Sequence, residues 1–137
     1  MSNVRYDVPN ESESVLSGVI LSNDSMFISS GGTAIDTTAT EYSHIEVLSG
    51  GTAQQTALTG YDARMNVYSG GRAEKTTVKN AGVLSVFDGG TAKTVVLDNY
   101  ASAYVASGGL ISDLEMSLYA SATCYGEISD LVQFKLR

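Results

Sequence analysis

The sequence predicts an all-β protein, a single-stranded parallel β-helix (β-solenoid) of about six coils. The first observation is a repeat of Gly-Gly pairs, spaced 19 or 20 residues apart along the 137-residue chain. The second is that apolar residues between the pairs lie mostly two positions apart, which is the period of a β-strand. The third is that one repeat has too few apolar side chains for a core, so successive repeats must stack. The pairs are Gly31-Gly32, Gly50-Gly51, Gly70-Gly71, Gly89-Gly90 and Gly108-Gly109.

The chain divides into three parts on this repeat. Residues 1–14 match no repeat, and we expect an N-terminal cap or a tail there. Residues 15–127 are the predicted solenoid. Residues 128–137 are the predicted last strand or truncated coil, in which Ile128-Ser-Asp-Leu repeats Ile111-Ser-Asp-Leu at a spacing of 17. An unpaired strand edge at this end is a template for a second chain, so we expect homo-oligomers through the solenoid ends or faces.

Each predicted coil has one strand before the glycine pair and one after it. Leu84 and Val86 are the inward residues of one such first strand, and Ala92, Val95 and Leu97 are those of the strand that follows. The glycine pair lies where the coil must turn, because glycine adopts positive φ without a Cβ penalty. Backbone hydrogen bonds then run along the axis of the solenoid between coils about 4.8 Å apart.

Two rows of residues are predicted to face outward. Leu48, Tyr68 and Phe87 each stand two positions before a glycine pair and form an apolar stripe. Together with Phe134 and Leu136 of the last strand they are our candidates for self-association. A second row, on the other turn, is an aromatic ladder interrupted by Ala81, and packing is favoured over sugar stacking as its role. Its members are Tyr42, Tyr61, Tyr100 and Tyr119.

The charge of the chain argues against nucleic acid as a partner. The net charge is −7, whereas a phosphate-backbone ligand needs clustered Lys and Arg. The charge is uneven, since residues 64–93 carry +3 and the remainder carries −10. A solvated mixed surface explains this distribution, and the alternative is that the basic middle of one copy meets an acidic end of another.

No catalytic, cofactor or metal site is predicted. His44 is the single histidine, expected in a turn, and no second ligand or triad partner stands at a recognisable spacing. Asp113 and Glu115 are the nearest approach to a carboxylate pair of a polysaccharide hydrolase or lyase, with Asp130 stacking near Asp113, and solvated charge explains them better. Cys124 falls in an inward column and is expected to be an inert small hydrophobe; an intermolecular disulfide at the last coil is the alternative.

Ice binding is a further non-enzymatic alternative. A flat threonine ladder on a solenoid would suit it, and Thr37, Thr56 and Thr76 do align. Val95 and Leu114 continue the same column and interrupt the ladder. We therefore rank this function low.

Three segments resemble the repeats of a known family. They begin Val47-Leu-Ser-Gly-Gly-Thr-Ala, Val67-Tyr-Ser-Gly-Gly-Arg-Ala and Val86-Phe-Asp-Gly-Gly-Thr-Ala. These segments are similar to the passenger-domain repeats, about nineteen residues long, of AIDA-type self-associating autotransporter adhesins. The resemblance covers about residues 15–127. It implies a right-handed β-helix at the surface of a Gram-negative bacterium, acting in adherence, aggregation, biofilm formation and virulence.

The same resemblance implies glycosylation of repeat Ser and Thr by a heptosyltransferase. The positions that match are the serines before the glycine pairs and the threonines after them: Ser30, Ser49, Ser69, Ser107, Thr33, Thr52 and Thr91. Asp88 replaces the serine in one repeat, and Arg72 and Leu110 replace the threonine in two others, so uniform modification is not expected. The signal peptide and the C-terminal membrane barrel of that family have no counterpart in these 137 residues.

The sequence therefore predicts a non-catalytic, secreted or surface-displayed module for adhesion and self-association, modified as a glycoprotein. Its expected partners are further copies, a glycosyltransferase, and a host-cell or bacterial surface. The alternative is a structural stalk or scaffold segment that oligomerises through its ends.

Overall fold

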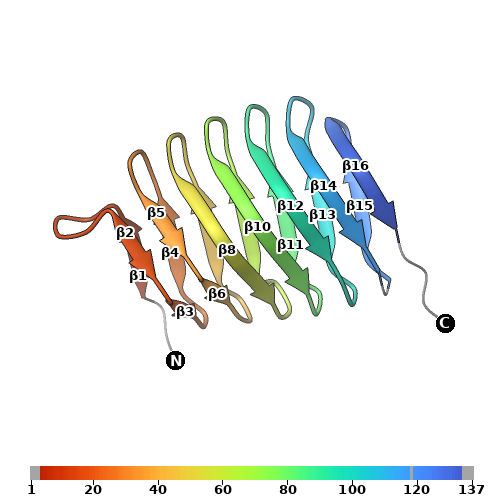
Figure 1. Ribbon diagram of the computed structural model, residues 1–137. Coiled ribbons are helices and arrows are strands. Elements are labelled where there is room, and N and C mark those ends of the chain that lie inside the picture. Colours follow the sequence, from red (N-terminus) through yellow and green to blue (C-terminus); the bar gives the residue numbers. More distant parts are fainter. Residues whose placement is uncertain (1–3, 118, 134–137) are drawn as a thin grey trace.

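The computed structural model describes residues 4–117 and 119–133, which form a parallel β-solenoid (Figure 1). Strands from successive coils stack into two sheets, and every recorded strand pairing is parallel, as between β8 and β10. The first sheet has seven strands, so the solenoid has about seven coils where the sequence suggested about six. The extra strand comes from residues 5–8, within the predicted cap or tail.

The first sheet holds the short strand of each coil. In spatial order its strands are β1 (Arg5–Val8), β4 (Ser25–Ile28), β7 (His44–Val47), β9 (Arg64–Val67), β11 (Val83–Val86), β13 (Ser102–Val105) and β15 (Ser121–Cys124). Each strand presents alternate residues to the interior, and the inward residues of neighbouring strands pair with one another, as Val67 does with Val86.

The second sheet holds the longer strands and lies in front of the first in Figure 1. Its main path is β2 (Val15–Ser17), β5 (Thr33–Ile35), β8 (Thr52–Thr59), β10 (Arg72–Lys79), β12 (Thr91–Leu97), β14 (Leu110–Met116) and β16 (Glu127–Gln133). Two short strands belong to the same sheet: β6 (Thr38–Ala39) pairs with β8, and β3 (Ile20–Leu21) pairs with β6.

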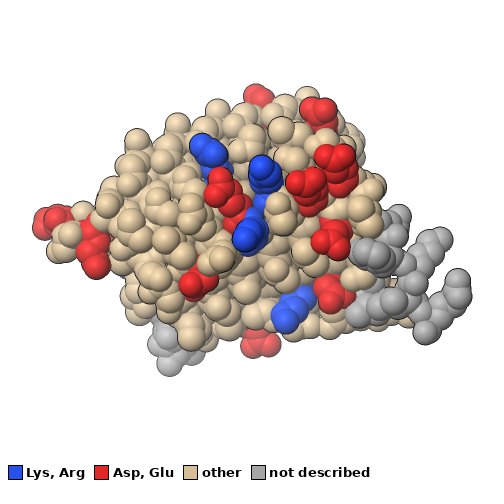
Figure 2. Space-filling view, viewed as in Figure 1, with Lys and Arg blue, Asp and Glu red and all other residues tan. Residues whose placement is uncertain are grey.

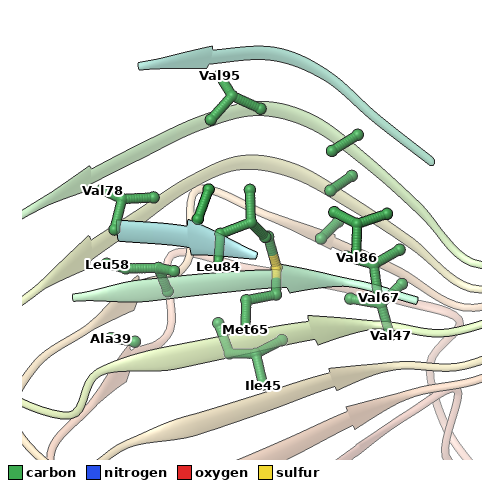
Figure 3. Close-up of a cluster of buried hydrophobic side chains, with 14 of the residues drawn as sticks. Ala39, Ile45, Val47, Leu58, Met65, Val67, Val78, Leu84, Val86 and Val95 are labelled. Carbon is green, nitrogen blue, oxygen red and sulfur yellow. The ribbon is translucent and has the colours of Figure 1, made fainter. Parts of the chain in front are cut away.

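The core lies between the two sheets and continues from coil to coil (Figure 3). Leu58, Met65, Leu84 and Leu97 are fully buried there. In the first sheet Ile45 pairs with Met65 and Met65 with Leu84, so like side chains stack along the axis. Burial of these columns is shared by all coils, which is why the repeats are stable only as a stack.

A residue with positive φ interrupts each long strand after its third residue. In β8 this residue is Gln55 (φ 55°), and it follows Gln54, so two consecutive side chains face outward before Thr56 turns inward. The equivalent residues in the other coils are Asp36, Lys75, Thr94, Asp113 and Asp130. This left-handed residue, which recurs in register in every long strand, explains why the apolar spacing within each long strand is three and then two.

The threonine ladder faces the interior, so it offers no surface to ice. Thr37, Thr56 and Thr76 are exposed by only 1%, 2% and 1% of their area. Their hydroxyl groups have no hydrogen-bond partner among the described residues. Val95 and Leu114 continue the column as buried apolar residues, which shows that the position belongs to the core.

Cys124 lies in the predicted inward column, but the burial expected for it is wrong, because Cys124 is exposed. It pairs with the buried Val105 in the next-to-last strand of the first sheet. Within the described residues no later strand of that sheet covers β15, so the column opens to solvent there. Phe134 and Leu136 lie outside the described residues. Across residues 4–117 and 119–133 no helix is long and apolar enough to cross a membrane.

Candidate functional site

The glycine pairs form a row of β-turns along one edge of the solenoid, at the top of Figure 1. In the turn Leu48-Ser49-Gly50-Gly51, the Gly51 N–H donates to the Leu48 carbonyl at 2.9 Å, and Gly50 has φ 81°. Positive φ at the third position is the signature of a type II turn, which favours glycine there. The serine occupies the second position, where its side chain is exposed.

The second glycine of each pair has a different role, since its φ is not in the positive region. A Cβ placed on Gly90 would lie 2.6 Å from the Val67 carbonyl oxygen, and one on Gly109 would lie 2.6 Å from that of Val86. The backbone of the preceding coil therefore occupies the space that a side chain would need. This close approach lets the turns stack without side chains between them.

The turns are linked into a continuous edge by backbone hydrogen bonds. The Gly50 N–H donates to the Gly70 carbonyl at 3.0 Å, and the Gly70 N–H donates to the Gly89 carbonyl at 3.0 Å. The serine hydroxyl packs on this edge, because a Cβ on Gly70 would lie 2.5 Å from Ser49 Oγ. Serines of neighbouring coils thus stand in one row, about one inter-strand spacing apart.

The predicted acceptors differ in exposure. Ser30, Ser49, Ser69 and Ser107 are all exposed on the turns. Thr91 is exposed at the start of β12, whereas Thr33 and Thr52 are half-buried. Asp88 is exposed at the serine position of its turn, so a carboxylate interrupts the row of hydroxyls there.

The predicted apolar stripe lies on the outer side of the first sheet and is packed against itself. Leu48, Tyr68 and Phe87 are half-buried, and the rings of Tyr68 and Phe87 stack with centroids 5.2 Å apart. Phe87 also meets Tyr104 edge to face at 6.3 Å, and Tyr104 meets Tyr125 at 6.1 Å. Sequence reasoning missed Tyr104, whose place within the strand gave no sign that it extends the stripe.

Glu46 holds Tyr68 of this stripe in place by hydrogen bonding. Its carboxylate accepts hydrogen bonds from the Tyr68 hydroxyl at 2.7 Å and from Asn66 Nδ2 at 2.9 Å. Burial and the neighbouring Glu46 carboxylate raise the pKa of Tyr68 from 10.0 to about 12. Tyr68 therefore stays protonated and hydrogen-bonded across the neutral pH range.

The opposite edge carries the tyrosine ladder as two pairs. Tyr42 and Tyr61 meet edge to face at 5.9 Å, and Tyr100 and Tyr119 stack at 5.0 Å. Ala81 separates the pairs, as the sequence indicated. The turn that contains Tyr61 has one residue more than the turn that contains Tyr42. Tyr61 is therefore out of register, and Asp62 (φ 60°) takes the left-handed position that Tyr42 (φ 61°) has in its own turn.

The outer face of the second sheet is divided into a basic and an acidic part (Figure 2), although the half-buried Glu74 lies among the cations and accepts a hydrogen bond from Arg72 at 3.3 Å. Strands β10 and β12 present the exposed cations, and β14 and β16 present the exposed acids. The basic patch is Arg72, Lys75, Lys79 and Lys93, and the acidic patch is Asp113, Glu115, Glu127 and Asp130. Asp113 and Asp130 are in register, as the spacing of 17 residues predicted.

The remaining candidates form no catalytic arrangement. His44 is the first residue of β7 and not a turn residue, and its Nε2 lies 3.8 Å from Asp62 Oδ2. The Asp62 carboxylate also accepts a hydrogen bond from Arg64 Nε at 2.5 Å. In the part of the chain that the structure describes, no three or more His, Cys, Asp and Glu side chains are grouped to hold a metal ion.

Comparison with solved structures finds a neighbour in the crystal structure of a TibA fragment that TibC has hyper-glycosylated. The two chains share 28% sequence identity with a TM-score of 0.67 over 88% of this chain. This chain spans about half, 48%, of the neighbour. No protein-family model matches the sequence, and the comparison with curated proteins finds no match. The likeness is thus to an AIDA-type autotransporter adhesin passenger fragment, and it supports an adhesin-like β-helical repeat module.

Proposed function

We propose that this protein is a non-catalytic module of the bacterial cell surface whose Gly-Gly turn edge is an acceptor for protein-linked sugars. The row of exposed turn serines carries the proposal. These hydroxyls stand beside glycines, so no neighbouring side chain within the turn shields them from an enzyme. The likeness to a hyper-glycosylated fragment supports the same assignment.

The acceptors are ranked by their exposure. Ser30, Ser49, Ser69 and Ser107 come first because all four lie at the exposed second position of a turn. Thr91 follows, since it is exposed but lies at the start of a strand. Thr33 and Thr52 come last because neighbouring coils half-bury them. Asp88 offers no hydroxyl, so the sugar row is interrupted in its coil.

Co-expression of the chain with TibC, followed by peptide mapping by mass spectrometry, tests this proposal. We expect sugar-sized additions on the four turn serines and none on Ser43 or Ser85, which are 0% and 7% exposed. Asp88→Ser should gain one further addition, and Ser49→Ala should lose one. If the chain carries no sugar after co-expression with TibC, or carries sugar only away from the turn edge, the acceptor role is contradicted.

We infer that self-association uses the divided outer face of the second sheet. In a two-fold symmetric dimer each patch of one copy meets the opposite patch of the other. The basic patch, centred on Lys75 and Lys93, would then face Asp113 and Asp130 of a second copy. The stripe of Leu48, Tyr68 and Phe87 is the competing candidate, although much of its apolar area is already covered by its own stacking.

Sedimentation velocity at low and high salt separates these surfaces. Charge pairing weakens as salt screens it, whereas apolar contact does not. We expect salt-sensitive dimers that Lys75→Glu with Lys93→Glu abolishes and that Leu48→Ser leaves intact. Dimers lost only in Leu48→Ser would move the interface to the stripe. Association lost only in Leu136→Lys would favour the second candidate function, a stalk that stacks through its ends.

A further inference from the structure

The last turn of the glycine edge is shorter than the others. The Tyr125 N–H donates to the Val105 carbonyl at 2.7 Å, as the Ala106 N–H does to Val86 one coil earlier. The Glu127 N–H donates to the Gly109 carbonyl at 3.0 Å, as the Leu110 N–H does to Gly90. Between these matched positions the last coil has one residue, Gly126, where the preceding coil has three.

A cavity of about 530 Å³ lies at the turn edge beside this shorter turn. Its floor consists of the glycine turns of the two preceding coils, and its remaining sides are Thr91, Leu110, Tyr125 and Glu127. We call this cavity the notch. Gly126 itself cannot carry a side chain, because a Cβ there would collide with the carbonyl oxygens of Ala106 and Gly109.

The floor of the notch offers a hydrogen-bond donor. In the preceding coil the Gly89 N–H donates to the Gly108 carbonyl at 3.0 Å. The shortened turn has no equivalent carbonyl, so the Gly108 N–H has no backbone acceptor among the described residues. The exposed Thr91 hydroxyl can donate or accept, and the exposed Glu127 carboxylate can accept.

The wall of the notch offers an aromatic face. Tyr125 is 69% exposed, and its recorded ring contact is an edge-to-face one with Tyr104 at an interplanar angle of 63°. Tyr68 stacks instead on Phe87 at 9°, and Tyr100 on Tyr119 at 14°, so each of those rings has a face covered by its partner. Tyr125 has no such parallel partner among the residues that the structure describes, so its ring face can receive a flat ligand.

This combination of groups selects the chemistry of a ligand. Within the described part of the chain the lining residues include no Lys, Arg or His, and the Glu127 carboxylate repels anions, which disfavours phosphates and acidic sugars. A ligand must present an apolar face to the Tyr125 ring and both donor and acceptor groups to the floor. Neutral pyranose sugars have these properties, because their axial C–H groups form an apolar face and their hydroxyls donate and accept.

We propose that the notch is a non-covalent binding site for a neutral pyranose saccharide. This site is distinct from the serine acceptors and goes beyond the proposed function, since it holds a free sugar ring without forming a bond to it. The described residues form one notch, so we expect one sugar site in each chain.

Saturation-transfer NMR on the unmodified 137-residue chain tests the site, with the methyl α-pyranosides of glucose, galactose and mannose as probes. We expect transfer to the ring protons of at least one probe. Tyr125→Ala should lower that signal about tenfold, which is the effect of losing roughly 1.4 kcal/mol of stacking. Tyr119→Ala, which removes a ring of comparable exposure (77% against 69%) from the opposite edge, should leave the signal unchanged.

A second variant addresses the notch itself. Inserting Ser-Gly between Tyr125 and Gly126 restores the nineteen-residue spacing, so the new turn should cover Gly108 and Gly109. We expect this insertion to abolish the sugar signal while the β-sheet circular dichroism spectrum is retained. A sugar signal that survives the insertion would place binding elsewhere and overturn the proposal. So would the absence of signal from all three sugars, or Tyr125-dependent transfer to methylguanidinium alone, which would make the notch a cation site.

Discussion

The two glycines of each pair are required for separate physical reasons. The first adopts the positive φ of a type II turn, as Gly89 does with φ 81°. The second, such as Gly90, lies against the carbonyl of the preceding coil. The sequence predicted the first role from turn chemistry. It could not predict the second, because that contact depends on how closely successive coils approach.

Gly90→Ala tests the close approach. The added methyl group would lie 2.6 Å from the Val67 carbonyl oxygen, so neighbouring coils must separate. We expect a loss of about 1–3 kcal/mol in the free energy of unfolding, measured by urea denaturation. Gly18→Ala is the control for φ strain alone, because Gly18 has φ 74° and no atom within 4 Å of its added Cβ. Unchanged stability of Gly90→Ala would show that the coils are not packed this closely.

Tyr68 should be distinguishable among the tyrosines by its titration. Its pKa of about 12 in the folded protein exceeds the ordinary value of 10.0. Above pH 10 the unfolded chain therefore binds fewer protons than the folded one, so the stability that this group contributes is lost as the pH rises from 10 to 12. Ultraviolet titration of phenolate should show one late step, absent in Tyr68→Phe and shifted to lower pH in Glu46→Gln. A late step that persists in Tyr68→Phe would refute the assignment.

At the scale of the strands, the alternation of apolar residues predicted the inward face of the short strands correctly and that of the long strands only in part. Alternation in Leu84 and Val86 predicted the inward face of β11. In β8, however, the left-handed Gln55 shifts the alternation, and nothing in the sequence of Gln54-Gln55 marks a residue with positive φ. Asp, Gln, Lys and Thr all occupy this left-handed position in different coils, so no single residue type identifies it in the sequence.

The buried threonine column gives a prediction at this scale. Thr56 contributes an unpaired hydroxyl to the core, and a buried polar group without a partner is destabilising. Val95 occupies the same column in β12, so the position accepts a valine. We expect Thr56→Val to stabilise the protein by about 1 kcal/mol in thermal unfolding. Thr52→Val, at a half-buried outward position, is the matched control with no expected change; a destabilised Thr56→Val would mean that the hydroxyl has a partner.

The whole molecule follows from the repeat, and its exceptions occur where the repeat changes. The parallel stacking and the glycine edge were predictable because each coil carries the same signals. The exposure of Cys124 was not, since column membership predicts burial only where another coil lies above. The notch was also missed: the spacing of 17 residues was visible, but the loss of a turn serine and glycine was not recognised as an opening.

The charge distribution shows the same limit at the level of a surface. The excess of cations in residues 64–93 was apparent from the sequence. Their place beside four acids became clear only once β10, β12, β14 and β16 were adjacent in one sheet. The sequence therefore showed that charge is uneven along the chain, and only the fold placed the two patches on one face.

The central claim is that the turn serines of successive coils stand in one closely spaced row. Pyrene labelling of cysteine pairs tests this directly in a Cys124→Ser background, at concentrations where the protein is monomeric. With Ser49→Cys and Ser69→Cys, which lie on adjacent turns, we expect strong excimer emission. With Ser30→Cys and Ser107→Cys, four turns apart and on the order of 19 Å distant, we expect monomer emission only. Excimer emission that is missing from the adjacent pair, or equal in both pairs, would contradict the stacked edge on which the proposed function rests.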